Sequence, residues 1–214
     1  MQRLYGILLD AWQHAATRQR LFALAIPMIL SNLSVPLVAL VDSAVVGRLP
    51  HAYQLGAVAV GASLYTVMVW TCGFLRMGST GFAAQAAGRN DQQALRSLLL
   101  QSLLLVLLLT VLCAAIILPL LPHILQWMQT SGELQGLAQE YFLIRMFGLP
   151  AALMMHVLVG WLLGIQNARA ALWMLLLCNA VNIILDVYFV FFLNWEVAGA
   201  ARASVMAEWS GALL

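Results

Sequence analysis

Two aspartates, Asp42 and Asp186, lie inside long apolar stretches of the sequence. An ionised carboxylate in the hydrocarbon of a membrane costs roughly 2.5–3.5 kcal/mol on insertion scales, so an acid at such a depth is a candidate for function. A carboxyl group there can bind a proton or an inorganic cation and change its charge as the ion comes and goes. The two aspartates are therefore the first candidates for ion coupling.

Asp186 is the last member of a polar stripe on one predicted helix. Asn179, Asn182 and Asp186 are spaced at i, i+3 and i+7, which places them within about 60° of arc on one helical face. Two amides and a carboxylate suit a small hydrated cavity, where the amides donate to the ionised acid. The alternative is a hydrogen-bonded cluster that only holds neighbouring helices together. The presence of the acid favours a functional site.

Asp42 shares its predicted helix face with two hydroxyls, Ser31 and Ser34. Pro36 removes one backbone hydrogen bond of this helix, and irregular helices with released carbonyls commonly line transport cavities. We therefore assign the two serines to a candidate substrate cavity. The alternative for Asp42 is an interfacial cap, because Arg48 follows only a few residues later.

The composition indicates a polytopic membrane protein of the all-α class. The 214 residues are 64% hydrophobic and 8% charged, against about 45–50% apolar and about 25% charged residues in ordinary soluble domains. The mean hydropathy is +0.93. The formal net charge is only +2, and the sequence has no basic tract of the kind that binds nucleic acid.

Enzyme, cofactor and metal motifs are missing from the sequence. Cys72, Cys113 and Cys178 lie in apolar stretches without C-x-x-C spacing or a neighbouring histidine, which is typical of buried small side chains rather than a metal site. The Gly-Ser-Thr-Gly run at 78–81 is not a nucleophile elbow, and no phosphate-binding loop indicates direct use of ATP. We therefore expect a protein that is not an enzyme and needs no cofactor.

The hydropathy pattern predicts six membrane spans after a short amphipathic segment. A spanning helix needs about 20 mostly apolar residues. Residues 1–20 carry apolar side chains at helical spacing beside charged ones, which predicts an interfacial helix on the cytoplasmic side. The predicted spans are 21–46, interrupted by Pro27 and Pro36, then 55–77, 98–121, 141–163, 172–193 and 197–214. No linker divides them, so they form one membrane domain.

The loop before the third span carries the signals of a turn and a new helix. It reads Gly-Arg-Asn-Asp-Gln-Gln at 88–93. Asparagine and aspartate are favoured caps at the start of a helix. We therefore expect a helix to begin here, with Asn90 or Asp91 as its cap.

Arginines in the short loops set the predicted orientation. Six of the seven loop arginines lie on the side of the N-terminus, which by the positive-inside rule places that end in the cytoplasm. The sixth span reaches Leu214 without a cap or a basic flank. We expect the natural chain to continue there, so that this sequence is an N-terminal portion.

The remaining polar residues in the spans are interpreted as parts of the bundle. Arg145, Arg202 and Glu208 are more typical of bundle or interface charges than of substrate ligands. His156 alone indicates a hydrogen-bonded bundle residue rather than a base. Met155 offers soft apolar surface and is a candidate for the substrate cavity, although plain packing is the simpler interpretation.

Several blocks of sequence, in the right order, resemble the MATE (multidrug and toxic compound extrusion) transporters, in particular their DNA-damage-inducible F branch. The resemblance covers nearly the whole chain. The blocks are Ala-Ile-Pro-Met-Ile-Leu-Ser-Asn at 25–32, Val-Asp-Ser-Ala-Val-Val-Gly-Arg-Leu at 41–49, Gly-Ser-Thr-Gly at 78–81, Ala-Gln-Ala-Ala-Gly at 84–88, Gly-Trp-Leu-Leu-Gly-Ile-Gln at 160–166 and Asn-Ala-Val-Asn-Ile-Ile-Leu-Asp at 179–186.

The resemblance implies a twelve-helix transporter of two six-helix lobes, of which this chain is the first. It implies export of amphipathic, often cationic drugs or toxic compounds by alternating access, coupled to H⁺ or Na⁺, across the inner membrane of a bacterium. The expected partners are these small molecules, the lipid bilayer and a missing C-terminal lobe. By the same resemblance, Asp42, Asn182, Asp186 and Ser204 form the coupling site.

Two other functions remain open from the sequence. A membrane scaffold or assembly subunit would use the polar stripes only as contacts between helices. A lipid-precursor flippase of the same superfamily would need a basic cavity for an anionic substrate. The candidate cavity residues here are acids and amides, which favour cations.

Overall fold

The computed structural model of the chain describes residues 15–49, 51–130 and 132–214; within the first helix the side chains of residues 15–17, 20, 24, 28, 31–32 and 34–39 are not described. Every regular element of these residues is a helix, so the all-α prediction is confirmed. The helices are α2 (Ala15–Val46), α3 (Ala52–Thr71), α4 (Phe74–Gly88), α5 (Gln92–Trp127), α6 (Gly132–Met146), α7 (Leu149–Gly164), α8 (Ala168–Val187), the π-helical turn η1 (Tyr188–Phe192) and α9 (Glu196–Ala212). The predicted amphipathic segment 1–20 lies mostly outside the described residues.

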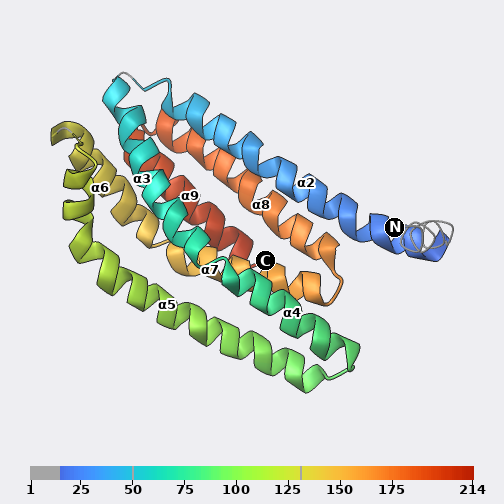
Figure 1. Ribbon diagram of the computed structural model, residues 1–214. Coiled ribbons are helices and arrows are strands. Elements are labelled where there is room, and N and C mark those ends of the chain that lie inside the picture. Colours follow the sequence, from blue (N-terminus) through green and yellow to red (C-terminus); the bar gives the residue numbers. More distant parts are fainter. Residues whose placement is uncertain (1–14, 50, 131) are drawn as a thin grey trace, which may run out of the picture.

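The helices form an elongated bundle, and most of them lie roughly along its length (Figure 1). The first helix α2 lies beside α8, and α8 packs in turn on α9. On the other side, α3 packs on α6 and α4 packs on α7. The long helix α5 runs along the edge of the bundle away from α2. This arrangement brings the two helices that carry the aspartates, α2 and α8, into direct contact.

Three helical stretches of the described residues are long and apolar enough to cross a membrane. They are Ala52–Gly88, Gln92–Trp127 and Ala168–Phe192, and the bent pair α6–α7 makes a fourth if it is one span. The chain therefore has the apolar helices of a multi-pass membrane protein. The division into six spans remains a prediction.

The prolines of the first helix do not interrupt it. Helix α2 continues from Ala15 to Val46 through Pro27 and Pro36, and α5 likewise continues through two prolines. A proline removes one backbone donor, but the turns on either side keep their own hydrogen bonds, and apolar surroundings offer no water to replace them. The predicted interruption of the first span is therefore wrong.

The fourth predicted span, 141–163, falls on two helices, α6 and α7, which meet at an angle of 50°. Helix α6 ends at Met146 and α7 begins at Leu149, with Pro150 in its first turn. Proline is favoured in the first turn of a helix and disfavours helical geometry in the residue before it. Pro150 therefore explains why the new helix starts here.

Helices α4 and α7 approach each other closely because α7 carries glycine at their contact. A Cβ on Gly164 would lie 2.6 Å from Cβ of Ala83 and 2.7 Å from the carbonyl oxygen of Thr80. Small residues let membrane helices pack backbone to backbone. This contact fixes one end of the bundle, whereas the acids lie toward the other end.

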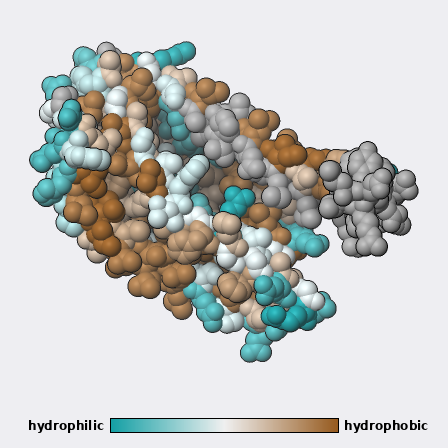
Figure 2. Space-filling model, in the orientation of Figure 1, coloured by the Kyte–Doolittle hydropathy of each residue, from teal (hydrophilic) through white to brown (hydrophobic). Residues whose placement is uncertain are grey.

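On the face shown in Figure 2, large apolar areas lie between hydrophilic groups at the two ends. Helix α5 begins at one of the two predicted caps, where Asp91 accepts from the backbone N–H of Ala94 at 2.9 Å. The same helix exposes many large apolar side chains, including Leu104, Leu108 and Val111. An exposed apolar surface of this extent is expected where lipid is the solvent.

Candidate functional site

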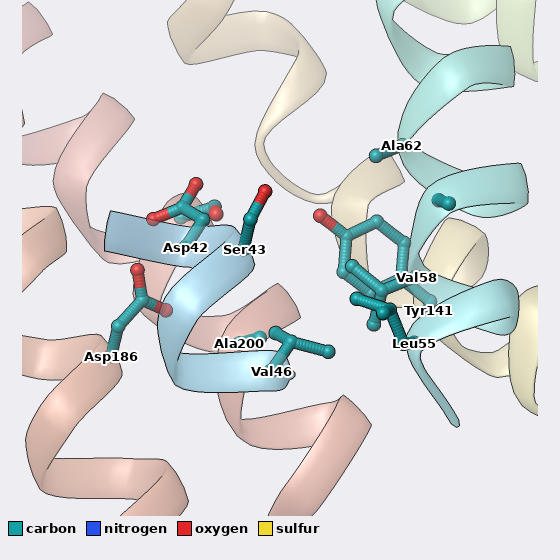
Figure 3. A pocket seen from close by; sticks show the side chains of 11 residues that line it. Asp42, Ser43, Val46, Leu55, Val58, Ala62, Tyr141, Asp186 and Ala200 are labelled. Atoms are coloured by element: carbon teal, nitrogen blue, oxygen red, sulfur yellow. The ribbon is translucent and has the colours of Figure 1, made fainter. Parts of the chain in front are cut away.

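A pocket of about 200 Å³ opens between α2, α3, α6, α8 and α9. Figure 3 shows Asp42 of α2 and Asp186 of α8 near each other on one side of the pocket, with Ser43 beside Asp42 and Tyr141 on the opposite side. The lining residues are Asp42, Ser43, Val46, Leu55, Val58, Ala59, Ala62, Tyr141, Asp186, Ala200 and Ser204. Five helices from all parts of the chain thus meet at the two acids.

The carboxyl groups of Asp42 and Asp186 lie within hydrogen-bonding distance of each other (Figure 3). Asp186 is only 1% exposed. Oδ1 of Asp42 and Oδ2 of Asp186 are buried and have no hydrogen-bond partner among the described residues. Each acid therefore keeps an oxygen that can accept from a donor or contact a cation.

The amide of Asn182 connects the acid pair to α9. Its side chain lies one turn before Asp186 on the same face of α8 and interacts with that acid. Its Nδ2 donates to Oγ of Ser204 at 3.4 Å. Helical spacing of i and i+4 brings the amide and the acid onto one face. The predicted stripe thus continues across the interface with α9.

Tyr141 closes the pocket opposite the acids. Its side chain comes from α6 and is buried, and its hydroxyl points across the pocket toward α2 (Figure 3). Apolar side chains such as Val46, Val58 and Ala200 complete the walls. The acids therefore face a mainly apolar enclosure in which few polar atoms compete for a bound ion.

The chain leaves regular α-helix directly after Asp186. Residues Tyr188–Phe192 form a π-helical turn, and the backbone N–H of Trp195 returns to the carbonyl oxygen of Phe189 at 3.0 Å. Single π-helical turns in proteins are often found at functional sites. This irregular end sets where α9 begins and hence how Ser204 faces the acids.

Other predicted site residues lie elsewhere or are not described. Asn179 does not line the pocket, although it lies on the same helix face as Asn182. Met155 packs among buried side chains of α7, α8 and α9 and does not line the pocket either. The side chains of Ser31 and Ser34 are outside the described residues.

Sequence reasoning missed several residues of this region. Tyr141 and Ser43 line the pocket, and the specific pairing of Arg145 with Glu208 was not predicted, although both were interpreted as bundle charges. A tyrosine four residues before a buried arginine on a predicted span was a usable signal for one polar helix face. His156, by contrast, contacts the carbonyl oxygen of Ala152 at 3.0 Å, as expected of a satisfied bundle histidine.

Comparison with known proteins identifies the family. The model of the MatE family matches residues 27–188. The DNA damage-inducible protein F of Escherichia coli (strain K12) is 43% identical over 194 residues, which cover 91% of this chain and 42% of that protein. The multidrug resistance protein PmpM of Pseudomonas aeruginosa is 32% identical over 73% of this chain and 33% of its own length.

A solved structure has the same arrangement of helices. The outward-facing conformation of a multidrug resistance MATE family transporter superimposes with a TM-score of 0.84 at 27% identity and covers 91% of this chain and 43% of that one. The chain thus spans about two fifths of the length of that structure and of the Escherichia coli relative. The sequence, the fold and the match over residues 27–188 agree, and the chain belongs to the MATE family, whose matched members are transporters rather than enzymes.

Proposed function

We propose that this chain is the N-terminal lobe of an exporter that couples the outward movement of amphipathic, often cationic compounds to the entry of H⁺ or Na⁺. The observation that carries the proposal is the acid pair. Asp42 and Asp186 come from different helices, lie within hydrogen-bonding distance and share one buried pocket. An isolated charge in a membrane is costly and marks an ion pathway by default.

The acid pair can bind either coupling ion. A hydrogen bond between two carboxyl groups needs one proton between them, because ionised carboxylates only accept. A sodium ion would instead use oxygen ligands, which the two acids, Ser204 and the amide of Asn182 offer within one region. In both cases the bound cation offsets negative charge that has no basic side chain among the residues lining the pocket.

Loss or gain of that cation can change the packing of two helices. Without a cation the two carboxylates of α2 and α8 repel each other, and with one they are held together. Since α2 and α8 are in direct contact, the ion then selects between two arrangements of these helices. By linkage, a substrate that prefers one arrangement opposes or supports ion binding by the same factor.

The pocket is too small to be the whole substrate site. Its volume of about 200 Å³ lies below the roughly 300–1,000 Å³ of pockets for drug-sized ligands. We therefore assign the pocket to the ion and place the substrate in a larger cavity completed by a C-terminal lobe. The relatives, of which this chain covers about two fifths, have the length for such a lobe.

The proposed cellular setting is the inner membrane of a bacterium, with the N-terminus in the cytoplasm. Six of the seven loop arginines support that orientation. In it, Asp42 at the end of α2 lies toward the outer side, where a cation driven by its gradient would arrive.

A lipid-precursor flippase is the second candidate, and a scaffold subunit the third. A flippase for an anionic lipid-linked substrate needs a basic pocket, whereas the polar lining here is two acids, two serines and a tyrosine. A scaffold would not need the unpaired carboxylate oxygens of Asp42 and Asp186, which are costly to bury.

The test uses the full natural chain reconstituted in liposomes with an imposed pH or sodium gradient. We expect a fluorescent cationic drug to move against its own gradient only when one of the ion gradients is present. Movement of a lipid-linked anionic probe without drug transport would favour the flippase. A folded protein that moves neither probe would favour the scaffold.

A further inference from the structure

A buried ion pair lies one helical turn from the pocket that holds Asp42 and Asp186. Arg145 of α6 donates through Nη2 to Oε1 of Glu208 on α9 at 2.8 Å. Its guanidinium carbon lies 3.9 Å from the centre of the Tyr65 ring on α3. The Tyr65 hydroxyl donates to the same carboxylate, 3.2 Å from Oε2. These three residues are called the Arg145 cluster below.

The cluster is in register with the pocket on all three helices. Residues three or four apart lie on one face of a helix. The helices α3, α6 and α9 run the same way through this part of the bundle (Figure 1), so the cluster forms the next layer of side chains. Each member follows a pocket-lining residue by three or four positions: Tyr65 follows Ala62, Arg145 follows Tyr141, and Glu208 follows Ser204.

Arg145 has more donors than the cluster uses. Its side chain is buried, and Nε and Nη1 have no hydrogen-bond partner among the described residues. Its charge interacts electrostatically with Asp42 and with Asp186 as well as with Glu208. A buried ion pair adds little to stability compared with well-packed apolar side chains. Stability alone is therefore a weak reason for a guanidinium at this position.

The pair also holds the bend between α6 and α7. Oε2 of Glu208 occupies the space that a Cβ on Gly148 would need, so a larger residue at position 148 would displace this carboxylate. The next residue, Trp209, donates from Nε1 to the carbonyl oxygen of Phe147 at 3.0 Å. Helix α9 thereby satisfies the end of α6, the helix that carries Tyr141 into the pocket.

We propose, building on the cation site proposed above, that Arg145 and Glu208 are positioning residues of that site. Their ion pair fixes α6 against α9 beside the pocket, and the carboxylate of Glu208 offsets part of the guanidinium charge that acts on the acids. If Glu208 loses its charge, the guanidinium repels a cation from Asp42 and Asp186. If Arg145 loses its charge, the carboxylate of Glu208 attracts the cation and retards its release.

Few polar groups surround the two acids, so the charges of Arg145 and Glu208 strongly affect a cation bound there. Tyr141 faces them from α6 and Asn182 from α8. Tyr65 belongs to α3 and Glu208 to α9, and the two interact with each other. Cys178 of α8 also interacts with Glu208. Within the described part of the chain, Arg145 is the basic group that interacts with both acids.

The test compares the neutral variants Glu208→Gln and Arg145→Gln in proteoliposomes, with the full natural chain. The measured quantity is the concentration of coupling ion at half-maximal drug efflux. A unit charge at roughly 10 Å in an effective dielectric of about 20 changes ion affinity about tenfold. We expect Glu208→Gln to raise that concentration about tenfold, Arg145→Gln to lower it about tenfold, and the double variant to return near the wild-type value.

Two controls separate charge from folding. Glu140→Gln removes one acid from an exposed position on α6 and should leave the half-saturating concentration unchanged. Glu208→Asp and Arg145→Lys keep both charges, and should keep the ion dependence even where they lower thermal stability. If one neutral variant does not fold, direct ion binding to the other neutral variant, compared with the wild type and with its charge-conserving counterpart, supplies the measurement.

The outcomes are separate from those of the proposed function. Opposite shifts in the two single variants support the inference. Shifts in the same direction, or no shift with a lower melting temperature, show that the pair only holds the bundle and overturn it. A wild-type protein without ion-dependent efflux would instead overturn the proposed function.

Discussion

Asn182 of α8 donates a hydrogen bond to Ser204 of α9 over 3.4 Å. Helical spacing with Asp186 predicts the role of the amide, whereas only the resemblance to the family assigns Ser204. Their contact connects the acid-bearing helix with α9, the helix that also carries Glu208. The predictions that follow depend on this connection or on the packing that maintains it.

The contact itself predicts the effect of Ser204→Ala. Removing one hydrogen bond costs about 0.5–1.5 kcal/mol, and the Asn182 amide loses a fixed orientation. We expect the half-saturating concentration of the coupling ion to rise about threefold to tenfold, with little change in expression. The measurement is ion-dependent drug efflux from proteoliposomes. Ser210→Ala is the control, because its hydroxyl bonds only to its own helix at the carbonyl oxygen of Ala207; an equal effect of both changes would contradict the prediction.

The proximity of the two acids can be tested without transport. Asp42→Cys combined with Asp186→Cys, in a protein whose three native cysteines are replaced by serine, should form a disulfide with mild oxidant. Disulfides need Cα atoms within about 7 Å, so the reaction reports the contact between α2 and α8. The crosslink is read by mass spectrometry of proteolytic fragments. Asp42→Cys with Asn179→Cys, two turns away on α8, should react much less.

The close contact between α4 and α7 predicts a loss of stability in Gly164→Ala. The new methyl group would meet Ala83 and the carbonyl oxygen of Thr80 at 2.6–2.7 Å, and overpacking costs typically about 1–3 kcal/mol. We expect a clear fall of the melting temperature in detergent. Gly78→Ala on α4 is the matched control, since nothing lies within 4 Å of its Cβ and alanine favours a helix by about 0.5–1 kcal/mol. A melting temperature of Gly164→Ala at or above that of Gly78→Ala would contradict the packing.

Gln54 joins the N-terminal ends of α3 and α9. Its Nε2 donates to Oε2 of Glu196 at 2.7 Å, and its Oε1 accepts from the backbone N–H of His51 at 3.2 Å. Gln54→Leu breaks both bonds at a buried position and should cost about 1–3 kcal/mol. Glu196→Gln keeps an oxygen acceptor, so its melting temperature should stay near that of the wild type. Equal losses in the two variants would show that the charge, not the hydrogen bond, stabilises this end.

The parts of the site that lie on one helix could be predicted from the sequence. The spacing of Asn182 and Asp186 determines that they share a face, and in the structure both side chains are buried on α8. The approach of Asp42 depends on the packing of α2 against α8, which no local pattern specifies. The pairing of Arg145 with Glu208 likewise joins distant helices. From the sequence, Arg202 on the same helix as Glu208 is an equally plausible ion-pair partner for that acid. Arg202 instead lies over the ring of Trp195 at 4.7 Å.

Helix boundaries follow local chemistry where that chemistry is strong. Asp91, one of the two predicted caps, caps α5. Prolines do not all mark a helix boundary. Pro150 lies in the first turn of α7, whereas Pro27 and Pro36 lie inside the continuous helix α2. A proline is tolerated in the first turn of a helix because the backbone donor that it lacks has no partner within the helix there.

The measurement that tests the central claim most directly is drug export by Asp42→Asn and Asp186→Asn in the full natural chain. Both variants are inserted in liposomes at matched amounts, with pH or sodium gradients imposed. We predict that each variant loses at least roughly nine tenths of the gradient-driven efflux of a cationic drug. The reason is that a neutral amide cannot take up and release a proton or offer a negative charge to a cation. Export by both variants at wild-type rates would contradict the assignment of the acid pair as the coupling site.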